Sequence, residues 1–483
     1  MEPVLTPEEM RAADRRAIAS GTPESVLMDR AGRAVAWAAR QRLGRTYGAR
    51  VVVACGPGNN GGDGRVAARV LRGWGARVDV VDVGSGVDAA ALVRRVGRAD
   101  LVVDAMYGTG FRGEMAGDAR LVCDVLVAFP GPVVSVDIPS GVDGLTGAVC
   151  GVAVRADETV VFAARKPGLL FEPGRSLAGT VRVVDIGIAV TDDGAPPPTF
   201  VTTGEDVAEW LPARPADAHK WSAGCLVVGG SGGMTGAPLL ASLAALRAGA
   251  GMVWCGLPGR DAAVRASGTE VITRSLPDDD GALSAAAAEV VLDDVDRFRS
   301  VAIGPGLGRA DGTAVAVRRL VSEVAVPLVV DADALHALAG HLDALQHRRV
   351  PAVLTPHAGE YAALSGSPLS TDRVEAARVL AAATGAVVLV KGPGTVVADP
   401  AGRAAICPLG GSGLATAGTG DVLTGIVAAF LARGVPPFEA AAAAAFVHAG
   451  AADRAGHTGL VAGDLVAALP ATLAACAPGA PGR

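Results

Sequence analysis

The residues best suited to chemistry lie in a glycine-rich stretch near the C-terminal end of the chain. Residues 410–425 read GGSGLATAGTGDVLTG and lead into an apolar run that predicts a buried helix. Glycines that open a helix direct unpaired backbone N–H groups at one point, and the helix dipole adds partial positive charge there, which favours a phosphate. Asp421, in the first turn, is placed to take a proton from a hydroxyl group facing that phosphate. The alternative is that Thr419 or Asp421 only caps the helix.

A second glycine-rich stretch follows a predicted strand over residues 51–55. It reads GPGNNGGDG (56–64) and precedes a helical pattern at 65–74, which is typical of the first unit of a doubly wound α/β domain. The stretch lacks the GxGxxG spacing of a dinucleotide fingerprint. Its side chains Asn59, Asn60 and Asp63 are suited to ribose, phosphate or a cation, with a simple tight turn as the alternative.

Two more loops favour the ligand-binding interpretation. Asp104 ends a predicted strand at 101–104, and Asp137 ends another at 133–137, with Ser140 three residues later. The carboxyl ends of parallel strands share one edge of the sheet, so Asn60, Asp104 and Ser140 are expected to converge. Hard oxygen ligands from three loops suit a cation such as K⁺ better than zinc.

Composition limits the class of protein. The chain has 483 residues, enough for two or more domains, and no uncharged apolar run reaches the roughly 18–20 residues of a membrane span. Seven scattered cysteines without a CxxC pair, and a start without an apolar signal segment, predict a cytoplasmic protein with reduced thiols. A net charge of −6 without a basic run argues against a nucleic-acid partner.

Lysine is rare in this chain. Among 43 basic residues only Lys166, Lys220 and Lys391 are lysines, and all three lie in Gly/Pro-rich segments. Each is therefore a candidate for a role that a planar guanidinium does not suit, although a chance position on the surface is the alternative.

The first half predicts an α/β domain. Thr6-Pro7-Glu8-Glu9 is a capping box, so a helix is expected from there to about residue 20, and another over 25–43. Further strands are expected at 78–83, 159–163 and 181–185. Residues 194–198 read GAPPP, a stiff linker, which places a domain boundary near residue 196 and divides the chain into domains 1–196 and 197–483.

The second half begins a new α/β pattern. A strand at 224–228 leads into GGSGGMTGA (229–237) and a helix to residue 248, and four more strand ends fall within 301–308, 327–335, 354–360 and 388–395. These ends carry Gly, Asp, His or Lys, which predicts a second sheet with a site along one edge. His357, three residues before Glu360, is a candidate functional residue. Asp331 or Asp333 is suited to Mg²⁺ together with nucleotide phosphates.

The first half, to about residue 190, resembles the NAD(P)H-hydrate epimerase family of the YjeF N-terminal type, through its NNGGDG and GTGFRG loops. The resemblance implies that Asn60, Asp104 and Ser140 bind K⁺ and that Asp104 is the acid–base group. Lys166 has either an active-site role or a surface position. The substrate-binding residues that the resemblance implies are Asn59, Asn60, Gly61, Gly62, Asp63, Gly108, Thr109, Gly110, Phe111, Arg112, Gly113 and Asp137.

Residues 219–431 resemble the NAD(P)H-hydrate dehydratases, whose fold is a ribokinase-like α/β/α sandwich, and the string LATAGTGDVL (414–423) is the most specific part of the match. The resemblance implies that Ala237, Gly306, His357 and Asp421 contact the hydrated nucleotide. The residues implied to bind the phosphoryl donor are Lys391, Gly392, Pro393, Gly394, Thr395 and Gly420. Trp221, Met234 and Gly411-Ser412 depart from the family pattern, which bears on substrate affinity more than on the reaction.

Together the two resemblances imply a Rossmann-like α/β/α domain followed by a ribokinase-like one, and one repair reaction. Water adds to the nicotinamide ring of NADH or NADPH and leaves a hydroxyl at C6. The first site interconverts the R and S forms, and the second phosphorylates the S form, using Mg²⁺ with ADP or ATP, so that phosphate leaves. A homo-oligomer is expected. The alternatives are a vitamin-precursor kinase with a regulatory N-terminal half, and an inactive N-terminal binding module.

Overall fold

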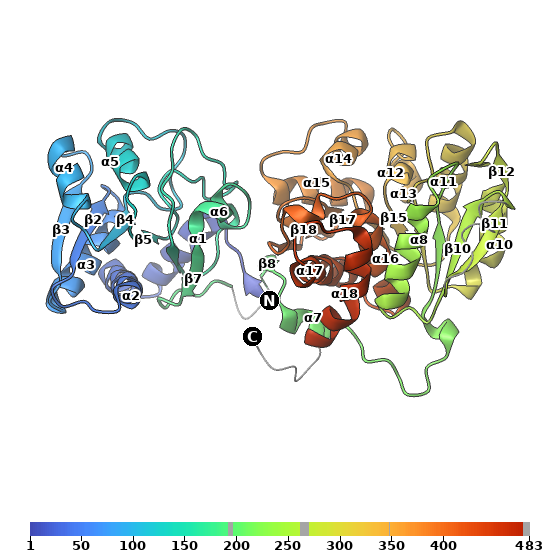
Figure 1. Cartoon of the computed structure of the whole chain (residues 1–483), viewed down its shortest axis with the longest axis horizontal. Coiled ribbons are helices and arrows are strands. Elements are labelled where there is room, and N and C mark those ends of the chain that lie inside the picture. The colour runs from blue at the N-terminus through green and yellow to red at the C-terminus, as the bar shows by residue number, and fades with distance from the viewer. Residues whose placement is uncertain (192–196, 261–269, 347, 477–483) are drawn as a thin grey trace. The chain divides into compact units, whose positions relative to one another are not determined.

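The chain folds into two compact units in a computed structural model that describes residues 1–191, 197–260, 270–346 and 348–476. The units are Glu2–Thr199 and Phe200–Arg483, the latter together with Met1. Each is an α/β structure built on a sheet that is wholly or largely parallel (Figure 1). The predicted boundary near residue 196 lies outside the described residues.

The first unit has a sheet with strand order β3-β2-β4-β5-β6-β7, and every pairing in it is parallel. This order places the carboxyl ends of β2, β4, β5 and β6 side by side, as the sequence predicts. The strands of this sheet are β2 (Arg50–Cys55), β3 (Arg77–Asp82), β4 (Leu101–Ala105), β5 (Val133–Val136), β6 (Glu158–Phe162) and β7 (Thr180–Val184), and the short β1 (Glu2–Pro3) is not part of it. The helices are α1 (Pro7–Ala19), α2 (Glu24–Leu43), α3 (Asn59–Gly73), α4 (Ala89–Val96), α5 (Gly117–Val127), η1 (Pro167–Leu169) and α6 (Gly174–Ala178).

Local sequence explains these elements. The predicted capping box begins α1, because the Thr6 hydroxyl accepts from the Glu9 N–H (3.2 Å) and the Glu9 carboxylate accepts from the Thr6 N–H (2.7 Å). In β2, Val51 and Val53 pack into one buried cluster and Val52 into another, so helices cover both faces of the sheet. A strand buried on both faces reads as a continuous apolar run, which is why it could be recognised in the sequence.

The start of α3 differs from the prediction. The helix begins at Asn59, six residues before the predicted start at Arg65, so most of the NNGGDG motif is helical rather than loop. A Cβ added at Gly61 would lie 1.9 Å from the Gly56 carbonyl oxygen, so the helix can start this early only because glycine lets the two backbones touch. The polar side chains of the motif therefore lie on the first turns of a helix.

The second unit has the strand order β8-β19-β18-β17-β16-β15-β14-β9-β10-β11. The pairings from β17 to β11 are parallel, whereas β18 runs antiparallel to both β17 and β19. The strands of this unit are β8 (Thr199–Val201), β9 (Gly224–Val228), β10 (Met252–Pro258), β11 (Ile272–Leu276), β12 (Asp278–Asp279), β13 (Ala282–Leu283), β14 (Ser300–Ile303), β15 (Leu328–Val330), β16 (Ala352–Leu354), β17 (Val387–Val390), β18 (Thr395–Ala398) and β19 (Ala404–Cys407).

The apolar run after the glycine-rich stretch forms α16 (Thr419–Ala432), which is buried from Val422 to its end and packs between α8 and α17 (Figure 1). A Cβ at Gly425 would lie 2.0 Å from the Ala241 carbonyl, so this glycine allows α8 and α16 to cross closely. The helices are α7 (Gly204–Trp210), η2 (Lys220–Ala223), α8 (Gly236–Arg247), α10 (Ala287–Asp294), η3 (Val295–Arg297), α11 (Asp311–Glu323), α12 (Asp333–Ala337), α13 (Asp343–Gln346), α14 (Ala358–Ser365), α15 (Arg373–Thr384), η4 (Ser412–Leu414), α16, α17 (Pro437–Ala455) and α18 (Ala462–Ala475).

Two expectations from composition can be compared with the fold. Across the described ranges, no helix combines the length and the apolar character needed to cross a membrane. All seven cysteines are free thiols, and six of them are buried.

Candidate active sites

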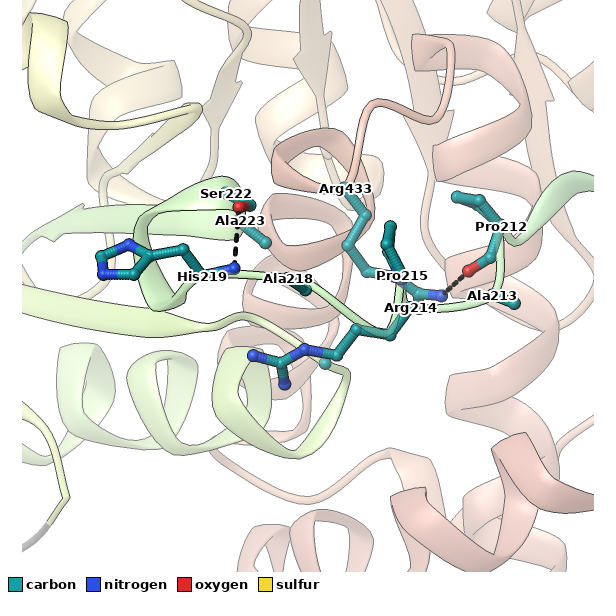
Figure 2. Close-up of a pocket in the computed structure, with 10 residues that line it drawn as sticks. Pro212, Ala213, Arg214, Pro215, Ala218, His219, Ser222, Ala223 and Arg433 are labelled. Atoms are coloured by element: carbon teal, nitrogen blue, oxygen red, sulfur yellow. Dashed lines mark hydrogen bonds between the residues drawn. The ribbon is translucent and has the colours of Figure 1, made fainter.

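A pocket of about 190 Å³ lies at the amino-terminal edge of the second sheet, next to the starts of β9 and β10 (Figure 2). Arg433, at the C-terminal end of α16, donates to the Pro212 carbonyl in its wall. None of the predicted site residues lines it. The lining residues are Pro212, Ala213, Arg214, Pro215, Ala218, His219, Ser222, Ala223, Gly249 and Arg433.

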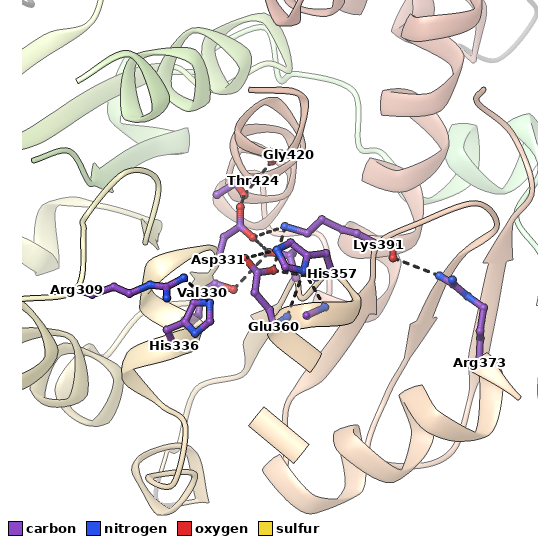
Figure 3. Close-up of polar contacts among 12 residues, drawn as sticks. Arg309, Val330, Asp331, His336, His357, Glu360, Arg373, Lys391, Gly420 and Thr424 are labelled. Carbon is purple, nitrogen blue, oxygen red and sulfur yellow. Dashed lines mark hydrogen bonds and ion pairs between the residues drawn. The ribbon is translucent and has the colours of Figure 1, made fainter. Parts of the chain in front are cut away.

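Three of the predicted residues of the second unit, His357, Lys391 and Gly420, lie around Asp331 at the opposite, carboxyl edge (Figure 3). Asp331 follows β15 and is 1% exposed. Its Oδ1 accepts from the Thr355 hydroxyl (2.7 Å) and the Lys391 ammonium (2.7 Å), and its Oδ2 accepts from the Thr424 hydroxyl (2.5 Å). Lys391 Nζ also lies 3.6 Å from Glu360 Oε2. The centre of the site is thus a buried ion pair.

Both partners of this pair are ionised at neutral pH. Burial by itself opposes the charge of Asp331, but the Lys391 ammonium and the donated hydrogen bonds outweigh it, so the pKa of Asp331 lies below its usual value. Burial likewise opposes the charge of Lys391, but the charges of Asp331 and Glu360 outweigh it and raise the pKa of Lys391.

The first turn of α16 faces this pair. Gly418 precedes the helix with φ +90°, a left-handed conformation that suits glycine. A Cβ at Gly420 would lie 3.7 Å from Lys391 Nζ, so the ammonium lies beside the turn. Among the described residues, the backbone N–H groups of Gly420 and Asp421 have no hydrogen-bond partner. The turn therefore combines free donors with a nearby cation, as an anion site requires.

Asp421 lies in the same turn and is not an N-cap, because Gly418 occupies that position. Its carboxyl group has no hydrogen bond or ion pair within the described parts of the chain. Burial, reinforced by the negative charge of Asp331, raises the pKa of Asp421 to about 7. A carboxyl group with that pKa can accept a proton at neutral pH, which is what a general base needs.

His448 is a residue of this site that sequence reasoning missed. It lies on α17, is 8% exposed, and its Nε2 is 2.8 Å from the carbonyl oxygen of Thr419, the first residue of α16. Burial lowers the pKa of His448 to about 4, so the ring is neutral and its Nε2–H donates to that carbonyl. The signal available in the sequence was a lone histidine in an otherwise alanine-rich apolar helix.

The two loops predicted to hold the hydrated nucleotide meet at Gly306. This glycine has φ +67°, and a Cβ there would lie 2.6 Å from the Met234 carbonyl oxygen and 3.4 Å from Ala237 Cβ. The Ser231 hydroxyl donates to the Gly306 carbonyl (2.9 Å). Ala237 and Gly306 are therefore neighbours, although about seventy residues separate them.

The side chain of His357 is exposed and also caps a helix. Its Nδ1 caps α14, where it accepts from the N–H groups of Gly359 (3.0 Å) and Glu360 (3.2 Å). Its Nε2 lies 3.3 Å from Glu360 Oε1. Its contact with the hydrated nucleotide stays a prediction.

The Lys391–Thr395 segment joins β17 to β18. Gly392 and Gly394 both have positive φ, +141° and +70°, and the guanidinium of Arg373 donates to the Lys391 carbonyl (3.3 Å). The Gly392-Pro393 tip is exposed. Only the lysine side chain of this segment reaches the Asp331 centre.

The two candidate magnesium ligands differ. The oxygens of Asp331 are all engaged with protein donors, as described above. Asp333 accepts the Gly308 N–H (2.9 Å), is partly exposed, and lies near enough to Asp421 to help raise its pKa. No cluster of three metal-ligating His, Cys, Asp or Glu side chains occurs in the ranges that the structure describes.

In the first unit, Asp104 is completely buried at the end of β4. Its carboxylate accepts from the Ser140 hydroxyl (2.6 Å), the Ser140 N–H (2.8 Å), the Ser135 hydroxyl (2.9 Å) and the Met106 N–H (3.3 Å). Burial raises the pKa of Asp104 against the effect of these hydrogen bonds. Asp104 and Ser140 thus converge as the sequence predicts.

Lys166 is not a surface residue. It is fully buried, and its Nζ lies 2.8 Å from Asp137 Oδ1 and 2.8 Å from the Phe162 carbonyl oxygen. Asp137 has φ +65°, and its Oδ2 accepts from the Thr109 N–H (3.3 Å). The surface alternative for Lys166 was wrong, because a lysine sealed inside the unit needs the carboxylate that it pairs with. Lys220, by contrast, is exposed.

The GTGFRG and NNGGDG motifs meet at Gly108. A Cβ there would lie 3.0 Å from Asn60 Oδ1 and 3.3 Å from Asp137 Oδ2. The Asn60 Nδ2 is buried without a hydrogen-bond partner in the described structure. Asn59 instead donates to Glu24 at the surface (2.9 Å). Asn60 and Asp137 therefore come together, and Asn59 points elsewhere.

Asp63 lies at the second turn of α3 and is 8% exposed. Like Asp421, it has no hydrogen bond or ion pair within the residues described. Burial, followed by the charges of Asp137 and Asp14, raises the pKa of Asp63 to about 8. It is therefore largely protonated at neutral pH.

The rest of the GTGFRG loop is more open. Gly110, Arg112 and Gly113 are exposed, Arg112 pairs with Asp143 (3.2 Å), and the Phe111 ring packs on Tyr107 with centroids 5.0 Å apart. The loop thus places an aromatic ring and a guanidinium at the rim of the site.

Comparison with known proteins assigns both halves. A family model described as NAD(P)H-hydrate dehydratase matches residues 225–473, and one described as YjeF-related protein N-terminus matches residues 24–94 and 85–168. The bifunctional NAD(P)H-hydrate repair enzyme of Salinibacter ruber is 43% identical over 97% of this chain and 95% of its own length. The chain belongs to the family of bifunctional NAD(P)H-hydrate repair enzymes.

A second member of this family matches the chain over a similar length. The enzyme of Moorella thermoacetica is 40% identical over 97% of this chain and 96% of its own length. The solved structure of the ADP/ATP-dependent NAD(P)H-hydrate dehydratase of Bacillus subtilis, co-crystallised with ATP and Mg²⁺, is 30% identical, covers 57% of this chain and 97% of its own, and has a TM-score of 0.49. The family and fold class predicted from the sequence, a Rossmann-like unit followed by a ribokinase-like one, are confirmed by the family matches and the two observed sheets.

Proposed function

We propose that this chain repairs hydrated NADH and NADPH, with an epimerase site in its first unit and a dehydratase site in its second. The observation that carries the proposal is the unpaired Asp421 beside Lys391 at the free N–H groups of α16. That arrangement is what transfer of a phosphoryl group to a hydroxyl requires, namely a base for the hydroxyl and positive charge for the moving group.

The dehydratase step follows from these positions. Asp421 takes the proton of the C6 hydroxyl, while the N–H groups of Gly420 and Asp421 and the ammonium of Lys391 stabilise the charge on the moving phosphoryl group. Phosphate is a far better leaving group than hydroxide, and the lone pair of the ring nitrogen expels it. The resulting iminium ion then loses a proton from C5, which forms the C5=C6 bond and restores the uncharged dihydronicotinamide ring. Ala237, Gly306 and His357 then serve to hold the hydrated nucleotide.

The dehydratase site also needs a phosphoryl donor and a metal ion. We expect ADP as the donor, with ATP as the alternative, held by Lys391, Gly392, Pro393, Gly394, Thr395 and Gly420. Asp333 fits Mg²⁺ better than Asp331, because it is partly exposed and its Oδ1 meets only the exposed Arg309 guanidinium, at 3.5 Å. Both oxygens of the buried Asp331 accept from protein donors, namely Thr355, Lys391 and Thr424. Mg²⁺ would supply charge that offsets the phosphate oxygens.

For the epimerase site we propose K⁺ held by Asn60, Asp104 and Ser140. The donor set is suitable, since it offers amide, carboxylate and hydroxyl oxygens, and the Oδ1 of Asn60 faces the Gly108 backbone of the adjoining loop. When bound, K⁺ supplies positive charge next to the buried Asp104. The substrate is expected against Asp137 and the loop formed by Gly108, Thr109, Gly110, Phe111, Arg112 and Gly113.

The test is to incubate the protein with chemically hydrated NADPH plus ADP, and in parallel plus ATP, and to follow the recovered absorbance of reduced nicotinamide. We expect full recovery with at least one nucleotide, and faster late-phase recovery in K⁺ than in Na⁺. No recovery with either nucleotide would contradict the proposal, and accumulation of a phosphorylated product without NADPH would indicate a kinase. The cytoplasmic location and the homo-oligomer stay predictions, the latter checked by light scattering.

A further inference from the structure

Two carboxyl groups of the epimerase site, Asp104 and Asp63, have opposite environments. Asp104, predicted as the acid–base group, has no exposed surface, and both of its oxygens accept hydrogen bonds from protein donors. A proton-transfer group must reach the substrate within about 2.6–3.2 Å or through one water. Asp104 is instead placed to fix the Ser140 loop and the proposed ion.

Asp63 has the opposite properties. It lies at the second turn of α3 and is 8% exposed, and no described residue gives its carboxyl group a hydrogen bond or an ion pair. Its oxygens are not among the fully enclosed side-chain atoms that lack a partner, so a ligand or a water molecule can reach them. Asp421, the proposed base of the other unit, shares two of these properties: it lies early in a helix, and it has no partner among the described residues.

The surroundings of Asp63 keep it neutral. Three elements bring charged groups toward it: Asp14 from α1, Asp137 from the end of β5, and Lys166 from the end of β6, with Glu24 of α2 next to Asp14. Lys166 is already engaged by Asp137, so it offers Asp63 no ion pair. The negative charge of Asp137 and the burial both favour the protonated form of Asp63.

We propose that Asp63, rather than Asp104, moves the protons during epimerisation, as a neutral carboxylic acid. This inference rests on the epimerase site proposed above. The Asp137–Lys166 pair is a positioning element that holds the Asp137 side chain near Asp63.

The chemistry balances with one carboxyl group. At C6 the substrate carries a hydroxyl next to the ring nitrogen, so the hydroxyl oxygen and the nitrogen have the same 1,3 relationship as the two oxygens of a carboxyl group. Asp63 gives its proton to the nitrogen as the N–C6 bond breaks, and its other oxygen takes the hydroxyl proton as the C6=O bond forms. Rotation about the C5–C6 bond and the reverse proton transfers close the ring on the other face. Asp63 ends as it began, and no other reactant is needed.

The test uses the full chain without ADP or ATP, so that the dehydratase is silent, and starts from the separated R epimer. The appearance of the S epimer is followed by chromatography and corrected for the spontaneous rate. Asp63→Asn keeps the size and neutral charge of the protonated side chain but cannot exchange two protons, so we expect kcat to fall by about 10²–10⁴-fold. Asp79→Asn, which changes an exposed carboxyl group on β3 of the same unit, is the matched control and should keep the wild-type rate.

The pH profile gives a second measurement that a structural role would not change. Because the protonated form acts, wild-type kcat should fall tenfold per pH unit above about 8, and any residual activity of Asp63→Asn should lack this limb. An Asp63→Asn variant with wild-type kcat, or with only a raised KM, would overturn the proposal. A wild-type chain that leaves the R epimer unchanged would overturn the epimerase function itself, which is a different failure.

Discussion

The ammonium nitrogen of Lys391 lies 2.7 Å from the buried Oδ1 of Asp331 and next to the first turn of α16. The lysine therefore does two things with one charge: it neutralises a carboxylate inside the unit and presents positive charge to the free N–H groups of the turn. Lys391, just after β17, therefore connects the buried Asp331 to the start of α16 at the centre of the second site.

Lys391→Arg should impair use of the nucleotide although it keeps the charge. A planar guanidinium is larger than an ammonium and cannot take its place between Asp331 and Glu360 without displacing one of them. We expect the apparent KM for ADP to rise by about tenfold or more, as the loss of roughly 1.4 kcal/mol would give. Lys220→Arg, at an exposed lysine, is the matched control. An unchanged KM in Lys391→Arg would remove Lys391 from the donor site.

Asp421→Asn should abolish dehydration and spare epimerisation. The carboxylate is the unpaired base at the anion site, and loss of a positioned base typically costs about 10²–10⁴-fold in rate. The epimerase activity of the same chain serves as an internal control for folding. Dehydration at a near wild-type rate would show that Asp421 is dispensable.

The pH dependence of dehydration should follow Asp421. Burial raises the pKa of this group to about 7, and the ionised form is the base, so activity should fall as pH drops below about 7 and level off above it. The profile of kcat against pH from 5 to 9 measures this directly. A rate that is flat between pH 5 and 7 would mean that another group accepts the proton.

His448→Leu should weaken the anion site without unfolding the unit. The substitution removes the hydrogen bond to the Thr419 carbonyl that positions the start of α16, and leaves an apolar side chain of similar size. We expect kcat for dehydration to fall by about tenfold, which corresponds to roughly 1.4 kcal/mol for one buried hydrogen bond. His448→Gln can still donate from the corresponding position and should recover most of this loss. Equal losses in both variants would indicate a packing role only.

Gly306→Ala should damage the dehydratase site more than the stability of the chain. A methyl group there would lie 2.6 Å from the Met234 carbonyl, so the loop that holds Ala237 must move. Gly402→Ala is the matched control, because Gly402 also has positive φ but has open space around it. Both variants should lose about 1–2 kcal/mol of stability from backbone strain, and Gly306→Ala should lose more because of its contact with the Met234 carbonyl. Only Gly306→Ala should raise the KM for the hydrated nucleotide. Equal KM values would place Gly306 outside the substrate site.

The glycine-rich motifs and the strand ends could be predicted because they depend on local rules. The runs that became β2 and β9 are buried on both faces, and the polar residues just after such strands must share an edge in a parallel sheet. The start of α3 was misplaced by six residues, since local glycine content favours a loop, and only the contact of Gly61 with the Gly56 backbone shows why a helix forms there.

The sequence alone determined the two α/β units, the family, and the side chains that gather at each carboxyl edge, because periodicity, glycine placement and motif spacing are properties of short segments. Tertiary structure decided which of these side chains are paired and which are not. In the folded chain, protein donors occupy both oxygens of Asp104 and of Asp331. Lys166 pairs with Asp137, and His448 contacts the Thr419 carbonyl. Asp63 and Asp421 have no partner among the described residues. Burial and the charges of distant neighbours set the pKa of a carboxyl group, and those neighbours come from strands and helices that only the folded chain brings together.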